Sequence, residues 1–124
     1  MSISQKVNVI DLSQGSMLPM QKGWHARNDS AYICWDTLTN SIILASKLTS
    51  LAKILNENAR NEYEYVKISG LYSAAQSSNA GYTGGLHKMR YGISRSNLAD
   101  AHTDAIEKAR SIGASKVSVV SEVA

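Results

Sequence analysis

The sequence of 124 residues contains no phenylalanine, a single proline and a single cysteine. Because Cys34 stands alone, no disulfide can form within the chain. Its place in the apolar run 32–35 indicates core packing, since a catalytic thiolate would need a nearby base or a helix N-terminus. Purely apolar stretches such as Ile42–Ala45 are far shorter than the ~20 residues that span a bilayer. With no apolar N-terminal leader either, we expect a soluble, cytoplasmic protein.

Recognisable catalytic and metal-binding motifs are also missing. The three histidines, His25, His87 and His102, are widely separated and lack metal-ligand spacing, and no cysteine pair exists. The chain has neither a nucleophile elbow nor a P-loop. We therefore expect no resident metal or cofactor and no enzymatic activity, although a site assembled from distant residues stays open.

The composition is that of a globular protein, with 44% hydrophobic and 19% charged residues, and the length predicts a single domain over 1–124. The net charge of +3 is mild, but its distribution is uneven. No acidic residue occurs in 12–28 or in 65–99, while both stretches contain cations. If these stretches meet in space, they create a local positive field that favours anions.

Alternation and turn residues predict strands, and helical spacing predicts two helices. The expected strands are Lys6–Leu12, Ala31–Trp35, Ser41–Ala45, Tyr63–Tyr72, Leu86–Arg95 and Lys116–Val123. A turn over Thr37–Asn40 makes the second and third of these a hairpin. The expected helices are 47–61 and a second one that begins after an N-cap at Asn97 and is followed by Gly113 at the C′ position, which favours a left-handed conformation.

From about residue 41 this order is β-α-β-β-α-β, which predicts an α+β fold of the ferredoxin-like split βαβ type. The sheet would be mainly antiparallel and would carry two helices. Residues 1–40 would add an N-terminal strand or hairpin at one edge. The alternative is a different α+β sheet built from the same elements.

The segment 76–85 is the leading candidate for a binding loop. Its glycines, asparagine and hydroxyls would let the backbone approach a ligand closely, Tyr82 offers a ring for stacking, and basic residues follow at once. Backbone amides and arginine suit phosphate. The expected ligand-binding residues are Asn79, Gly81, Tyr82, Thr83, Gly84, Gly85, Lys88, Arg90 and Arg95, with His25 and Arg27 contributing from the N-terminal segment.

The favoured function is a non-enzymatic binding protein that holds or sequesters a small anionic, nucleotide-type ligand. A viral protein that removes a signalling nucleotide of host defence would be one such case. A homodimer or higher homo-oligomer is expected, because small sheets expose edges that invite pairing. The first alternative is a protein inhibitor or adaptor anchored by Tyr, Trp and Arg, which dominate interface hot spots. The second is a small RNA-binding module.

Overall fold

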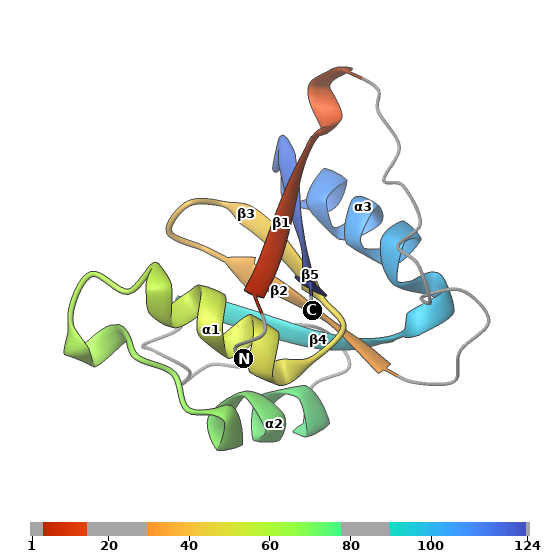
Figure 1. Ribbon diagram of the computed structural model, residues 1–124. Helices are drawn as coiled ribbons and strands as arrows, with labels where there is room; N and C mark the ends of the chain where they lie inside the picture. The colour runs from red at the N-terminus through yellow and green to blue at the C-terminus, as the bar shows by residue number, and fades with distance from the viewer. Residues whose placement is uncertain (1–3, 15–29, 78–89, 124) are drawn as a thin grey trace.

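The computed structural model describes residues 4–14, 30–77 and 90–123, which form one sheet with helices on both of its faces (Figure 1). The strands are β1 (Ser4–Asp11), β2 (Ser30–Asp36), β3 (Ser41–Ala45), β4 (Tyr91–Asn97) and β5 (Lys116–Val123). The α-helices are α1 (Leu48–Glu57), α2 (Ile68–Ser77) and α3 (Ala101–Ser111), and the short 3-10 helices are η1 (Leu12–Gln14), η2 (Glu62–Glu64) and η3 (Leu98–Asp100). This architecture confirms the α+β class.

The five strands lie in the order β1-β5-β3-β2-β4. The β3–β5 pair is parallel and the other three pairs are antiparallel, so the sheet is mainly antiparallel as predicted. The predicted hairpin is β2–β3. Its turn reaches Asn40, whose φ of 50° lies in the left-handed region that asparagine tolerates better than most residues. The Asn40 side chain accepts a hydrogen bond from Trp35 Nε1 at 3.1 Å and donates one to the Ile112 carbonyl at 3.0 Å.

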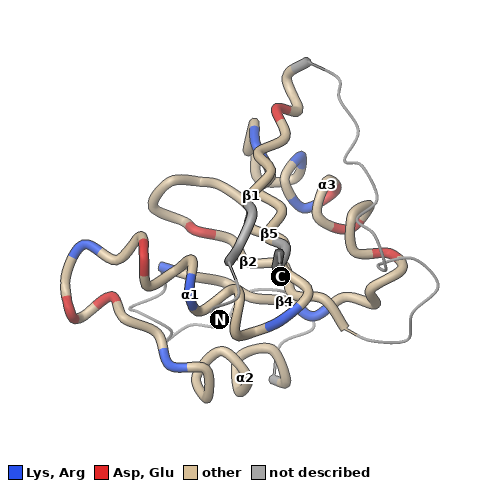
Figure 2. Tube along the Cα trace, in the orientation of Figure 1, with Lys and Arg blue, Asp and Glu red and all other residues tan. Residues whose placement is uncertain are grey.

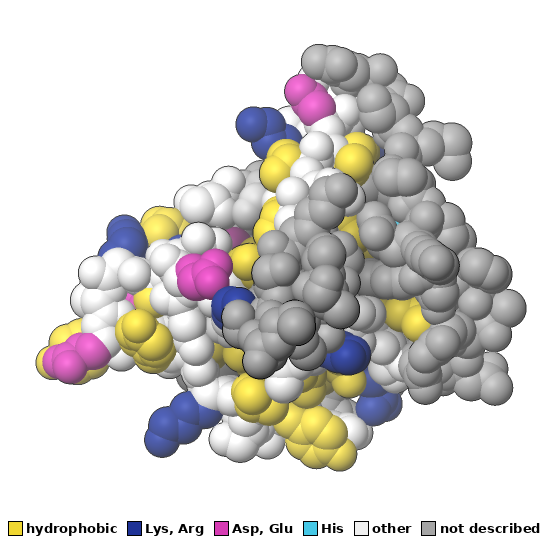
Figure 3. Space-filling model, viewed as in Figure 1, with side chains coloured by type: hydrophobic (Ala, Val, Ile, Leu, Met, Phe, Trp, Pro, Cys, Tyr) yellow, Lys and Arg dark blue, Asp and Glu magenta, His cyan; other side chains and the backbone are white. Residues whose placement is uncertain are grey.

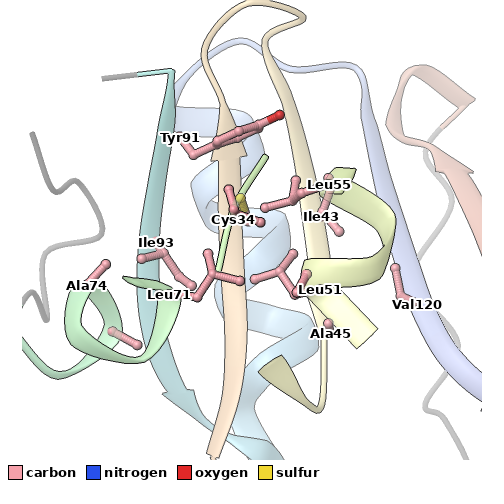
Figure 4. Close-up of a cluster of buried hydrophobic side chains, with 13 residues drawn as sticks. Cys34, Ile43, Ala45, Leu51, Leu55, Leu71, Ala74, Tyr91, Ile93 and Val120 are labelled. Atoms are coloured by element: carbon pink, nitrogen blue, oxygen red, sulfur yellow. The ribbon is translucent and has the colours of Figure 1, made fainter. Parts of the chain in front are cut away.

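The helices divide the core into two clusters, one on each face of the sheet. Alanines of α3 pack against β2, β3 and β5 on one face, where Ala101, Ala105 and Ala109 are fully buried. Small side chains there allow the helix to approach the sheet closely. On the other face α1 and α2 cover the sheet, and Leu51 and Leu71 point toward one another between them (Figure 4).

The predicted strand at Tyr63–Tyr72 is wrong, because this segment contains most of η2 and the first half of α2. Its aromatic and β-branched residues have high strand propensity, which favoured the incorrect prediction. The buried residues Leu71, Ala74 and Ala75 follow helical spacing instead. From Ser41 the described elements therefore run β-α-α-β-α-β, with a helix where the ferredoxin-like order requires a strand.

Several boundaries also differ from the expected ones. Helix α1 ends at Glu57 rather than at residue 61, and α3 begins at Ala101, after η3, with no side-chain cap from Asn97. Gly113 does adopt the expected left-handed conformation, with φ of 73°. The amide of Ala114 donates to the Ala109 carbonyl at 2.8 Å, which completes a Schellman motif after α3.

The N-terminal prediction is confirmed in its main point, since β1 pairs with β5 and forms one edge of the sheet. The hairpin strand β2 lies inside the sheet, between β3 and β4. Within 4–14, 30–77 and 90–123, no helix is both long and apolar enough to cross a membrane.

Substitution of Leu71 tests the helical packing of α2. Leu71 is fully buried and its neighbour Tyr72 is 55% exposed. Leu71→Ala is expected to lower the free energy of unfolding by about 2–5 kcal/mol through lost burial and a residual cavity. Tyr72→Ala is the matched control and should change it by less than about 0.5 kcal/mol. Urea denaturation followed by circular dichroism measures both values, and equal losses would contradict this packing.

Candidate functional site

Only two of the predicted ligand-binding residues, Arg90 and Arg95, lie in the part of the chain that the structure describes. The other nine lie outside the described residues: His25, Arg27, Asn79, Gly81, Tyr82, Thr83, Gly84, Gly85 and Lys88. Arg90 comes just before β4 and Arg95 lies within it, and the two arginines line different pockets. The structure therefore does not bring them together around one anion.

Arg90 lies at the centre of an ion cluster made of Asp36, Arg60, Glu64 and Arg90. It comes immediately before β4, in register with the end of β2, so that its guanidinium meets the Asp36 carboxylate. Arg90 Nε donates to Asp36 Oδ1 at 3.2 Å and its Nη2 to Oδ2 at 3.1 Å. This is the bidentate geometry that suits arginine and carboxylate.

The same guanidinium holds a second carboxylate from η2. Arg90 Nη1 lies 2.7 Å from Glu64 Oε2 as an ion pair, without the alignment of a hydrogen bond. Arg60 binds Glu64 from the solvent side, with its Nη2 2.6 Å and its Nε 2.9 Å from Oε1. The backbone amide of Arg60 also donates to Glu64 Oε2 at 2.6 Å. Glu64 is therefore saturated with donors.

These contacts shift the acid–base properties of the ion cluster. The hydrogen bonds from the Arg60 side chain and amide lower the pKa of Glu64 from 4.5 to about 2. The hydrogen bond to Asp36 raises the pKa of Arg90, against the opposing effect of burial. Burial raises the pKa of Tyr91 to about 12, and the Arg90 guanidinium lies 4.8 Å from the centre of the Tyr91 ring.

A groove of about 630 Å³ opens beside the ion cluster, between β1 and α1. We call it the β1–α1 groove, and its lining includes Val7, Leu38, Ile43, Ile54, Arg60 and Arg90. The arginines in it are matched by carboxylates, since Asp36 and Glu57 line the same groove. An anion entering there would have to displace carboxylates from Arg90.

Arg95 lines a second pocket of about 370 Å³ between β4 and α3. This β4–α3 pocket also contains Ser94, Ser96, Asp104, Glu107 and Lys108. Arg95 Nη1 donates to Gln76 Oε1 at 3.3 Å, and Gln76 is the first residue of the predicted binding loop. Arg95, one of the predicted ligand-binding residues, thus lies beside the point where that loop begins.

The positive field expected from the acid-free stretch 65–99 is weakened by the fold. Acidic residues from other segments lie next to its arginines, Glu64 and Asp36 at Arg90, and Asp104 within the pocket of Arg95. Figure 2 shows acidic and basic positions interleaved along the described chain, including both signs on α3. Sequence spacing alone did not reveal these neighbours. Only the Arg60–Glu64 pair carries a local signal, the i,i+4 separation of opposite charges.

Two further titratable side chains, Cys34 and His102, are buried outside the ion cluster. Cys34 is fully buried, and desolvation raises the pKa of its thiol, which confirms the prediction of core packing. His102 is also buried, and burial lowers its pKa. Among the residues that the structure describes, no three metal-ligating side chains form a cluster.

Comparison of the chain with protein-family models, with curated proteins and with solved structures found no match.

The ion cluster predicts a specific acid sensitivity. Because the pKa of Glu64 is lower in the folded chain than its usual 4.5, its contribution to stability is complete above pH 4.5. That contribution is lost as the pH falls from 4.5 to about 2. Glu64→Gln should therefore flatten the pH dependence of unfolding in this interval, as measured by urea denaturation at each pH. Glu62→Gln, at an exposed position of the same 3-10 helix, is the control and should keep the wild-type slope.

Proposed function

We propose that this chain is a non-enzymatic protein-binding module whose recognition surface lies on η2 and α2. The supporting observation is a cluster of exposed apolar and aromatic side chains there, which we call the tyrosine patch: Tyr63, Tyr65, Ile68 and Tyr72. These four side chains are between 47% and 81% exposed, although they fall within ten residues of sequence. In Figure 3, exposed hydrophobic side chains lie over the η2 and α2 margin of the molecule.

Such a patch has the chemistry of a protein interface. Tyrosine brings a large apolar ring and a polar hydroxyl at low entropic cost, and it is enriched at binding hot spots. Ile68 and Tyr72 are four residues apart on α2, so they present adjacent side chains on its outer face. A folded chain seldom exposes several large apolar groups together without an interaction to serve.

The segment that carries the tyrosine patch is held in place by polar contacts. Asn56 of α1 donates to the Val66 carbonyl at 3.2 Å and accepts from the Val66 amide at 2.8 Å. The Asn61 side chain accepts a hydrogen bond from the Tyr63 amide at 3.0 Å. Glu64 belongs to the ion cluster and is held there by Arg60 and Arg90. The surface is therefore organised before a partner arrives, which reduces the entropy lost on binding.

Site-specific photo-crosslinking tests this surface. A photoreactive phenylalanine analogue at position 72 should form a discrete adduct with one partner protein in a lysate of the native host. The same analogue at Thr103, an exposed position on α3, is the matched control and should not. Tyr65→Ala and Ile68→Ala should each weaken the adduct at position 72 at least about fivefold, since truncating a hot-spot side chain costs ~1 kcal/mol or more. Equal adducts from positions 72 and 103, or none from either, would contradict the proposal.

A second candidate function is the binding of a small anionic ligand of nucleotide type. The observation that favours it is the Arg95–Gln76 contact, which places a cation at the start of the predicted binding loop. Lys108 and Ser94 line the β4–α3 pocket and add donors suited to phosphate oxygens. Tyr82, which would stack on the base, lies outside the described residues.

Native mass spectrometry of the freshly purified protein tests this second candidate. A bound mass in the nucleotide range is expected, and Arg95→Ala and Tyr82→Ala should each reduce its occupancy. Lys53→Ala is the control for the loss of one positive charge, because Lys53 is exposed on α1 and does not line the β4–α3 pocket. A wild-type spectrum with no adduct, or one that Lys53→Ala reduces equally, would count against ligand binding at this pocket.

A further inference from the structure

Strand β1 is an edge strand whose outer backbone groups can be assigned from its pairing with β5. The amide of Leu12 donates to the Ser115 carbonyl at 2.8 Å, and the register continues Ile10↔Val117 and Asn8↔Val119. In an antiparallel pair the residues that bond to the neighbouring strand alternate with residues that point away from it. The even-numbered residues of β1 therefore bond to β5, and the N–H and C=O groups of Val7 and Val9 point outward.

The side chains at these outward-pointing positions are exposed and apolar. Val7 is 41% exposed and Val9 is 57% exposed. The other edge strand, β4, is different, because Tyr91 and Ile93 at its outward-pointing positions are fully buried in the cluster beneath α1 and α2. Among the described residues, that buried cluster includes none from β1. Unprotected apolar edges of this kind act as templates for strand pairing.

We propose that β1 pairs antiparallel with β1 of a second copy of this chain, across a two-fold axis at Asn8. An axis at Asn8 sets the exposed Val7 of each copy against the exposed Val9 of the other, so that apolar side chains meet across the new strand pair. In this register Val7 faces Val9 of the other copy and bonds to its backbone, and Asn8 faces Asn8. The two sheets join into one, and closed two-fold pairing uses up both exposed edges.

This pairing also merges the two β1–α1 grooves. Residues directly opposite one another in a sheet share a face, so the valines of both copies gather on the α1 side. Val7 already lines the groove beside Ile43 and Ile54. Across the two-fold axis, the apolar linings form one continuous trough, floored by four valines and bounded by the α1 helices of both copies. Burial of those valines drives association.

The first test is the mass in solution, measured by light scattering after size-exclusion chromatography. Wild-type protein is expected as a dimer. Val7→Lys/Val9→Lys should raise the dimer dissociation constant at least about tenfold, because charges on an edge strand oppose pairing. Ile68→Lys/Tyr72→Lys adds the same charge at the tyrosine patch and should leave the dimer intact. A wild-type monomer, or a dimer that the valine substitutions do not weaken, overturns the proposal.

The second test reads the register directly. Residues facing one another without mutual backbone bonds have Cα atoms about 4.5 Å apart, within the range of a disulfide. Asn8→Cys should therefore crosslink rapidly under mild oxidation. Val9→Cys is the control, since its copy-related partner lies diagonally at about 7–8 Å, too far for a disulfide. Cys34 is fully buried and common to both variants. Equal or faster crosslinking of Val9→Cys rules out this register, and unchanged melting temperatures verify that both variants fold.

Discussion

The ion pairs of Arg90 with two carboxylates are the interactions on which the surrounding structure depends. Asp36 ends β2, Glu64 belongs to η2, and Arg90 precedes β4, so one guanidinium joins three segments distant in the sequence. Charges removed from water in this way are tolerated only when each has a partner of opposite sign. The ion cluster therefore positions η2 relative to the sheet, and with η2 it positions the first half of the tyrosine patch.

The two surfaces that the structure exposes are compatible with one another. The tyrosine patch lies on η2 and α2. The apolar edge belongs to β1, which forms one edge of the sheet, and β4 forms the other edge. Pairing through β1 would keep the α1 and α2 faces of both copies on one side of the joined sheet. A dimer would then present two tyrosine patches in the same direction, and a partner with repeated sites would gain avidity without new contacts.

Much of the fold could be predicted from the sequence, because alternation and helical spacing reflect burial directly. The strands β1, β2, β3 and β5 and the Gly113 helix end follow from such local patterns. The segment that contains α2 could not be predicted correctly, since its tyrosines and β-branched residues favour a strand and only packing against α1 decides otherwise. The acidic partners of Arg90 were also hidden, because Asp36 lies 54 residues away from it in the sequence. Long-range pairing of charges leaves no periodic signal.

The pairing of β1 with β5 has a consequence for the order in which the chain folds during synthesis. The register joins Ser4 to Val123, so all elements from β2 to α3 lie between the two partners in the sequence. The elements from β2 to α3 can assemble earlier, but β1 cannot form its pair until β5 leaves the ribosome. Closing so long a loop is slow, and unpaired strands are prone to aggregation while they wait. Nascent β1 therefore stays an unpaired strand until β5 has been made.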